Sequence, residues 1–86
     1  MAIRSFRVQV SDGQYTKIAD NSVTVSIIEN YASWLRIVVT DVGDPQPSIE
    51  ETNFILCNST YERSGDAVDV WVAANEGVVD VSGETV

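Results

Sequence analysis

The sequence predicts a single all-β domain over residues 1–86, a β-sandwich of Greek-key or jelly-roll type with about seven to eight short strands. Apolar and polar side chains alternate along most of the chain, as in half-buried strands. Turn residues recur about every 8 to 12 positions, a spacing typical of sandwiches. Valine is abundant, and its branched side chain suits a pleated surface better than a helix.

The first half of the chain is expected to hold four strands, at residues 5–10, 15–19, 23–27 and 34–39. In the first of these, Phe6, Val8 and Val10 alternate with polar residues. Asp12-Gly13 follows, and this pair indicates a hairpin because both residues tolerate positive φ. The polar segment 20–22 is expected to form a turn between the second and third strands.

The second half is expected to hold strands at 54–58, 68–72 and 79–82, separated by turns at 64–66 and 75–77. The segment 41–48 contains Pro45 and Pro47, which lack the N–H of a sheet ladder. We therefore expect a loop there that crosses between two sheets. At most one helical turn is expected over Ser48–Asn53, and the tail 83–86 is expected to fray.

Side-chain chemistry favours a non-enzymatic protein without a cofactor or a metal site. There is no histidine, so the commonest general base and the Ser-His and Cys-His nucleophile pairs are missing. The single cysteine, Cys57, forms no intramolecular disulfide and no cysteine-based zinc site. It lies in an apolar run and is interpreted as a small buried hydrophobe.

Charge is distributed unevenly along the chain. Asp and Glu number 13 against 5 Lys and Arg, giving a formal charge of −8. Residues 1–17 nevertheless carry Arg4, Arg7 and Lys17 against Asp12, a balance of +2, which leaves −10 for the remainder. Nucleic acid is not expected as a partner, because its binding depends on clustered Lys and Arg. The charge either serves solubility or lets the basic segment meet an acidic neighbour.

Arg4 and Arg7 are the candidate contact residues of this basic segment. We expect both side chains to point outward together while Phe6 packs inward. Guanidinium groups pair with carboxylates in a bidentate manner. The expected partner is a neighbouring copy or another acidic protein.

Trp34 and Trp71 lie on strand faces opposite their aliphatic neighbours. If the aliphatic faces form the core, both indoles point outward, with Tyr15 and Tyr31 as possible companions. Such aromatic residues are enriched at protein interfaces, and they also stack on sugar rings. The alternative is that one or both cover an end of the core.

The segment Asp41–Glu51 is acidic, and carboxylates on a flexible loop suit Ca²⁺. Its spacing matches no calcium-loop motif, so a solvated loop is the preferred interpretation, and cation binding stays open. The N-terminal residues lack the apolar run of a signal peptide, and no apolar run is long enough to span a membrane. A protein made in the cytoplasm and without a membrane partner is therefore expected.

Two stretches resemble small virion structural proteins of tailed bacteriophages. One runs from Asp12 to Asp20 and on into Val23-Thr24-Val25, and the other from Arg63 to Ala73. The resemblance implies an all-β head-decoration (cement) protein that is dimeric or trimeric and is assembled into virions in the host cytoplasm. It would close gaps on the lattice of the major capsid protein by strand addition and apolar contact. A tail, neck or fibre-base component is the alternative within this class, and a carbohydrate-binding module is the alternative outside it.

Overall fold

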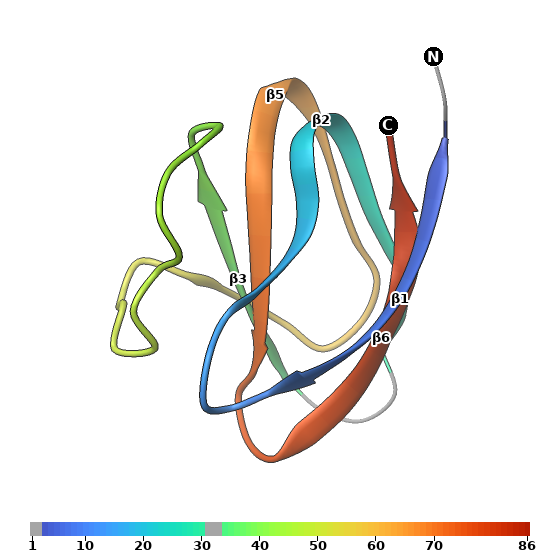
Figure 1. Ribbon diagram of the computed structural model, residues 1–86. Helices are drawn as coiled ribbons and strands as arrows, with labels where there is room; N and C mark the ends of the chain where they lie inside the picture. Colours follow the sequence, from blue (N-terminus) through green and yellow to red (C-terminus); the bar gives the residue numbers. More distant parts are fainter. Residues whose placement is uncertain (1–2, 31–33) are drawn as a thin grey trace.

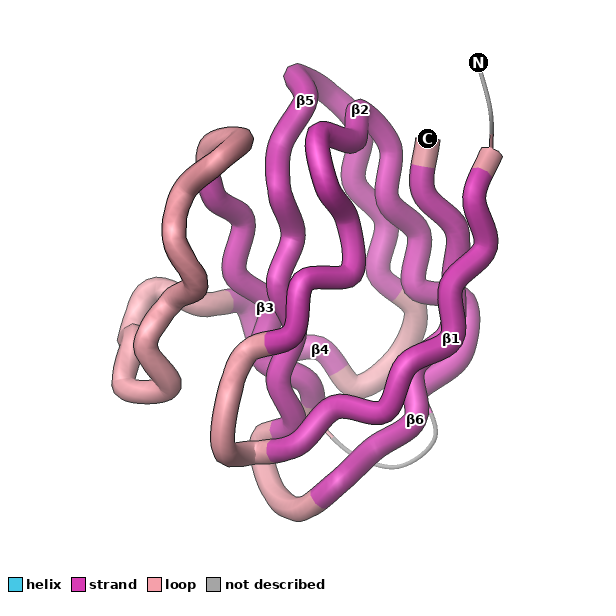
Figure 2. The backbone as a smooth tube through the Cα atoms, viewed as in Figure 1, coloured by secondary structure: helices cyan, strands magenta, loops and turns pink. Residues whose placement is uncertain are grey.

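The computed structural model describes residues 3–30 and 34–86, and it confirms the all-β fold. Its strands are β1 (Arg4–Ser11), β2 (Thr16–Asn30), β3 (Leu35–Thr40), β4 (Ile55–Cys57), β5 (Tyr61–Ala74) and β6 (Val78–Thr85) (Figure 1). They form one antiparallel sheet in the order β1-β6-β2-β5-β3-β4. Figure 2 shows strands joined by loops throughout the described chain. Among the residues described, no helix is long and apolar enough to cross a membrane.

The structure has six strands where the sequence predicted seven or eight, and two of the predicted turns lie inside strands. The segment 20–22 belongs to β2, where irregular pairing with β5 absorbs the extra residues and Asn21 adopts a φ of 50°. The predicted turn at 64–66 belongs to β5, with Gly65 at a φ of 151°. Polar and glycine residues suit a β-bulge as well as a turn, so composition alone did not distinguish the two.

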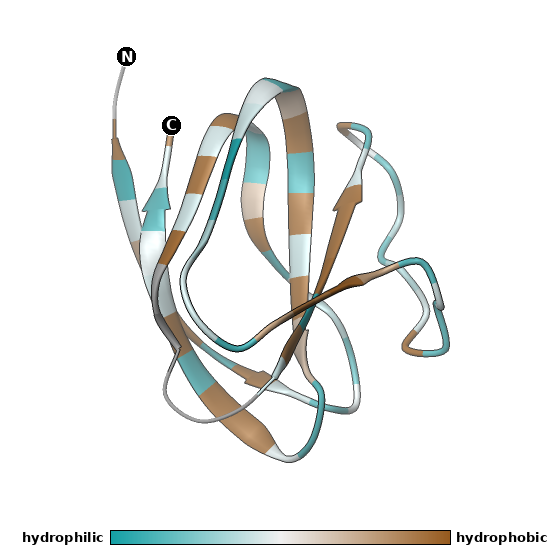
Figure 3. Cartoon of the chain, turned by 180° about the vertical axis from the view of Figure 1, so that it is seen from behind, coloured by the Kyte–Doolittle hydropathy of each residue, from teal (hydrophilic) through white to brown (hydrophobic). Residues whose placement is uncertain are grey.

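One sheet, rather than two sheets joined by a crossover, encloses the core. Because β2 and β5 are long and bent, β1 and β6 lie on one side of the molecule and β3 and β5 on the other (Figure 1). Valine, isoleucine and leucine side chains from both sides form a single buried cluster that includes Val10, Ile37, Val70 and Val81. Alternating bands of hydropathy along the strands follow this arrangement (Figure 3).

The proline-containing loop does not cross between sheets. It joins β3 to β4, which are hydrogen-bonded neighbours, and it folds back over the outer face of the sheet. There a second buried cluster forms from Tyr15, Val38, Trp71 and Ala73, and Ile49 and Phe54 of the loop segment pack against it. Within this segment the amide of Glu51 donates to the carbonyl of Ser48 at 2.9 Å, which closes a single turn, and none of residues 48–53 is helical.

The C-terminal tail was predicted to fray, but residues 83–85 belong to β6 and Val86 is hydrogen-bonded to β2. The amide of Val86 donates to the carbonyl of Thr24 at 2.9 Å, and the amide of Val23 donates to the carbonyl of Val86 at 2.7 Å. Gly83 packs so closely under Phe6 and the backbone of Ser26 that no side chain fits there. Non-local pairing with β2 therefore fixes a segment whose local sequence is turn-like.

Candidate interaction surface

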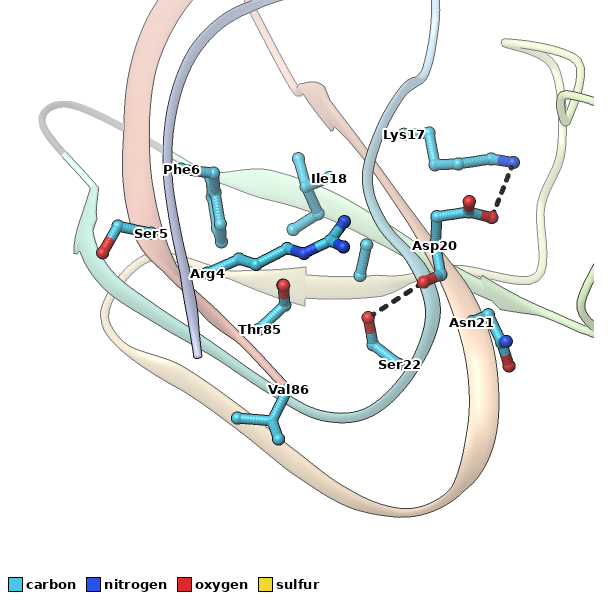
Figure 4. A pocket seen from close by; sticks show the side chains of 11 residues that line it. Arg4, Ser5, Phe6, Lys17, Ile18, Asp20, Asn21, Ser22, Thr85 and Val86 are labelled. Atoms are coloured by element: carbon cyan, nitrogen blue, oxygen red, sulfur yellow. Dashed lines mark hydrogen bonds and ion pairs between the residues drawn. The ribbon is translucent and has the colours of Figure 1, made fainter. Parts of the chain in front are cut away.

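A groove of about 590 Å³ separates the beginning of β1 from the first half of β2 (Figure 4). Residues 4–6 of β1 and residues 17–22 of β2 form its sides, and Thr85 and Val86 close one end. It exists because β6 pairs with residues 25–30 of β2, so the first half of β2 lies beyond that ladder. The sheet is thus open between β1 and this half of β2.

The groove combines an apolar interior with a polar rim. Phe6, Ile18 and Ala19 supply apolar lining, and Ile18 and Ala19 belong to the main core. The side chain of Arg4 extends across the groove toward Asp20 (Figure 4). A partner segment with alternating apolar and polar side chains matches such a lining.

The free edge of β1 can be deduced from the register. Thr24 and Val86 exchange both backbone hydrogen bonds, at 3.3 and 2.9 Å. The backbone N–H and C=O groups of successive residues in an antiparallel strand point alternately to its two neighbours. Those of Thr85 and Gly83 in β6 therefore point toward β1, where they lie opposite Arg4 and Phe6. The next set of β1 residues, Ser5, Arg7 and Gln9, therefore directs its N–H and C=O groups away from β6.

The other end of the sheet is the three-residue strand β4. The amide of Asn75 donates to the carbonyl of Trp34 at 2.9 Å. The backbone N–H and C=O groups of even-numbered residues of β3 therefore point toward β5, and those of odd-numbered residues point toward β4. Leu56, which lies opposite Arg36, consequently directs its N–H and C=O away from β3. Ile55 and Leu56 are 48% and 49% exposed, which is unusual for aliphatic residues on an edge strand.

Arg4 and Arg7 do not point the same way, contrary to the sequence-based expectation. Side chains in a strand alternate with a period of two, so Arg4 lies on the same face as Phe6, and Arg7 lies on the opposite face. Arg4 lines the groove, and Arg7 is exposed on the outer face of β1. The two arginines therefore serve two different surfaces.

The predicted aromatic surface is present only in part. Trp34 is 46% exposed, as expected, but Trp71 and Tyr15 are buried at 8% and 1% exposure. Trp71 does lie on the face opposite Val70 and Val72, but the loop after β3 covers that face, and the indole Nε1–H donates to Thr40 Oγ1 at 3.0 Å. Trp71 is therefore buried, but in this outer cluster on the central strand β5 and not at an end of the main core. Tyr31 lies outside the described residues.

Sequence reasoning missed Asp69, a fully buried carboxylate on the central strand β5. Its Oδ1 accepts the amide of Asn21 at 2.9 Å, and its Oδ2 accepts the amide of Gly43 at 3.0 Å and lies 3.3 Å from Lys17 Nζ. The hydrogen bond from Asn21 lowers the pKa of Asp69 most, the Gly43 and Lys17 contacts lower it further, and burial opposes them. Its alternation with Val68 and Val70 indicates only that Asp69 faces away from these valines, because alternation alone does not reveal what covers the outer face.

Lys17 is engaged on the outer face as well as at the rim of the groove. Its Nζ lies 3.6 Å from Asp20 Oδ1 and 5.0 Å from the centroid of the Trp71 ring, in addition to its contact with Asp69. The basic charge that remains for a partner in the groove is thus centred on Arg4, while Arg7 is exposed on the outer face of β1.

The acidic loop uses its carboxylates for local turns. Asp44 Oδ2 accepts the amide of Asp41 at 3.2 Å, and Glu51 Oε1 accepts the amide of Asn53 at 2.9 Å. In the described part of the chain, no three His, Cys, Asp or Glu side chains gather in a way that could hold a metal ion.

Comparison of the chain with protein-family models, with curated proteins and with solved structures gives no match in any of the three. The groove, the free edge of β1 and the exposed edge strand β4 are therefore the features on which a functional proposal rests.

Proposed function

We propose that this chain is a non-enzymatic structural protein of a tailed-bacteriophage virion, and specifically a capsid decoration (cement) protein. The observation that carries the proposal is the free edge of β1 beside an amphipathic groove. Such an edge accepts an extended segment of another chain through backbone hydrogen bonds, while side-chain pockets supply specificity. Structural proteins that associate with a lattice need this kind of surface, and it requires no catalytic group.

The sequence resemblance gives additional support. Its two stretches, which start at Asp12 and at Arg63, lie next to each other as β2 and β5. They contribute Lys17 and Asp69, the ion pair that joins these strands on the outer face. The resemblance therefore concerns one contiguous part of the fold.

The proposed partners are the major capsid protein or other virion proteins, together with further copies of the chain in a dimer or trimer. The proposed location is the virion, after assembly in the host cytoplasm. Neither nucleic acid nor a membrane is among the proposed partners. A tail, neck or fibre-base protein would use the same edge. The carbohydrate-binding alternative loses its principal support, because Trp71 is buried and only Trp34 of the two tryptophans is exposed.

Mass spectrometry of purified phage particles tests the proposal. We expect the chain in intact particles at a fixed copy number relative to the major capsid protein, and in heads after heads and tails are separated. Recovery in tails alone would establish the alternative within the class. Absence from particles, together with glycan binding that is lost in Trp34→Ala, would overturn the proposal in favour of carbohydrate binding.

A further inference from the structure

We infer that the segment received by the free edge of β1 is β4 of a second copy, so that copies join head to tail in one continuous sheet. This inference rests on the proposed function, because it names the partner of the same edge. Three properties of the two edges support it: their direction, the faces of their side chains and their chemistry.

The direction of the strands permits the pairing. The sheet order places β1 at one end and β4 at the other, and every neighbouring pair is antiparallel. In a sheet of six such strands, the two end strands run in opposite directions. A second copy that continues the sheet therefore brings its β4 alongside β1 in antiparallel orientation, the same pairing that the rest of the sheet uses.

The faces of the side chains also match. On β1 the residues with unpaired N–H and C=O groups, such as Ser5, lie on the outer face. Their neighbours Phe6 and Val8 pack against the main core, and successive side chains of a strand point to opposite faces. On β4 the residue with unpaired backbone groups is Leu56. It lies on the outer face, because it is opposite Arg36, which in turn is opposite Ala73 of the buried cluster on that face. Hydrogen bonding between the two free edges thus keeps both apolar inner faces on the same side of the joined sheet.

The position of the groove selects one register. The groove borders residues 4–6 of β1, and β4 is three residues long. Placing Leu56 opposite Ser5 sets Ile55 beside Phe6 and Cys57 beside Arg4. Ile55, which is half exposed in the isolated chain, is then covered by the apolar lining of the groove.

The chemistry of the two edges is complementary. β1 carries the exposed arginine Arg7, which lies opposite Phe54 in this register, and the segment leading into β4 carries the exposed carboxylates Glu50 and Glu51, four and three residues before Phe54. Pairing of two β1 edges would bring like charges together, which is unfavourable in a sheet. Pairing of β1 with β4 avoids this repulsion and covers the exposed side chain of Ile55.

This contact joins two different surfaces, so it is heterologous. Such contacts form rings when the rotation between copies closes and open filaments when it does not. Each copy then contributes one β1 and one β4 edge, a geometry suited to a protein that repeats on a lattice.

Disulfide trapping tests the contact. In the selected register, Arg4 and Cys57 of the neighbour form a non-hydrogen-bonded pair, whose Cα atoms lie about 4.5 Å apart, within the usual range for a disulfide. We expect Arg4→Cys, under mild oxidation, to give a ladder of disulfide-linked multimers with a 4–57 linkage identified by mass spectrometry. The ladder should be lost in Arg4→Cys with Cys57→Ser. Arg7→Cys is the matched control, because its side chain lies on the opposite face and should give no linkage to Cys57.

Proline substitution tests the hydrogen bonding separately. Leu56→Pro removes an N–H that the isolated chain does not use for pairing with β3, and edge strands tolerate proline at such a position. We expect this variant to keep the far-ultraviolet circular dichroism spectrum of the wild type but to sediment as a monomer at concentrations where the wild type is oligomeric. Ile55→Pro is the comparison variant, since its N–H points toward Ile37 and its loss should weaken the isolated fold.

The outcomes separate this inference from the proposed function. A wild type that is monomeric at all concentrations, a Leu56→Pro variant that associates like the wild type, or equal linkage in Arg4→Cys and Arg7→Cys would overturn head-to-tail pairing. Detection of the chain in phage heads would leave the proposed function standing in that case. Head-to-tail multimers of a chain that is absent from particles would overturn the proposed function and support the inference.

Discussion

Asp69 shows how a single side chain can join three segments that are distant in sequence. It accepts amides from Asn21 in the bulge of β2 and from Gly43 in the loop after β3, and it pairs with Lys17. A buried carboxylate is unfavourable unless its oxygens are hydrogen-bonded, and these contacts satisfy both of them. Asp69 therefore stabilises the bent sheet and the loop that covers its outer face.

Replacing Asp69 with Asn should destabilise the protein by about 1.5–3 kcal/mol, the usual range for a hydrogen bond to a charged group. Asn retains the shape of the side chain but loses the charge and offers an N–H₂ group where an acceptor is needed. Urea denaturation at neutral pH measures the difference. Asp80→Asn on exposed β6 is the control and should leave the free energy of unfolding unchanged within about 0.5 kcal/mol.

The same carboxylate predicts a pH dependence. The pKa of Asp69 is lower in the folded protein than in the unfolded chain, where it is about 3.9. Its stabilisation is therefore complete above about pH 5 and is lost as the pH falls through the folded-state pKa. We expect the stability difference between the wild type and Asp69→Asn to be constant from neutral pH to about pH 5 and to shrink below about pH 4. A difference that stays constant in acid would contradict this assignment.

Gly83 is required for close packing between β6 and its neighbours. A Cβ at this position would overlap the carbonyl oxygen of Ser26 and would lie 2.8 Å from Cζ of Phe6. Since backbone atoms are on one side, Gly83→Ala should cost at least about 1–3 kcal/mol, the usual range for overpacking. Gly13→Ala is the matched control, because its nearest atom would be Ser11 Oγ at 3.7 Å. Thermal unfolding of both variants checks the prediction, and equal melting temperatures would contradict it.

At the scale of elements, the loop between β3 and β4 acts as a cover for the sheet. Ile49 and Phe54 pack on the cluster that contains Tyr15 and Trp71, and the Arg36 guanidinium lies 5.0 Å from the Phe54 ring centroid. The loop begins with a turn in which Gly43 has a φ of 89° and donates its amide to Asp69. The conformation of this one glycine thus connects the loop to the central strand.

Gly43→Ala should destabilise the protein by about 1–2 kcal/mol, because an L-residue with a side chain disfavours positive φ. No atom lies within 4 Å of the Cβ that would be added, so the effect comes from the backbone conformation and not from a clash. Gly43→Asn should cost less, since Asn adopts positive φ more readily. Chemical denaturation of the two variants tests this. An equal loss in the free energy of unfolding for Gly43→Ala and Gly43→Asn would refute the backbone explanation.

At the scale of the whole molecule, the acidic charge influences how copies approach one another. The chain carries −8 overall, so long-range repulsion opposes any association of copies, while Arg4 and Arg7 lie at one edge of the sheet. Screening by salt shortens the range of both effects to about 10 Å at 0.1 M. Charge therefore selects which edges meet more than it determines how tightly they bind.

The double variant Arg4→Glu with Arg7→Glu should keep the fold of the isolated chain but weaken assembly, and the loss should be larger at low salt than at high salt. Each surface pair contributes only about 0.2–1 kcal/mol, so the effect becomes measurable through repetition in an assembly. Sedimentation or particle occupancy across a salt series measures it. Arg63→Glu is the control for Arg7→Glu, because it changes the charge equally on β5, away from the β1 edge. Wild-type assembly at every ionic strength would show that these arginines are only solvated.

Local sequence patterns were enough to predict the all-β class, most strand positions and the inward faces of the strands. These follow from the period-two alternation of residues such as Phe6, Val8 and Val10, a local property of the chain. The same alternation places Arg4 on the face of Phe6 and Arg7 on the opposite face. The prediction that both arginines point outward together was therefore wrong although the sequence contains the information needed to correct it. The resemblance to phage proteins and the assignment of function stay predictions.

Which residues on the outer faces are covered became evident from the folded chain alone. Asp69 and Trp71 alternate with valines just as solvated strand residues do, and they are buried because the loop between β3 and β4, which is distant in sequence, folds over them. The bulge at Asn21 and the bend at Gly65 were likewise indistinguishable from turns until β2 and β5 were seen to pair along their length. Local patterns fix the faces of a strand, whereas strand order, free edges and covered surfaces depend on non-local contacts that no local pattern contains.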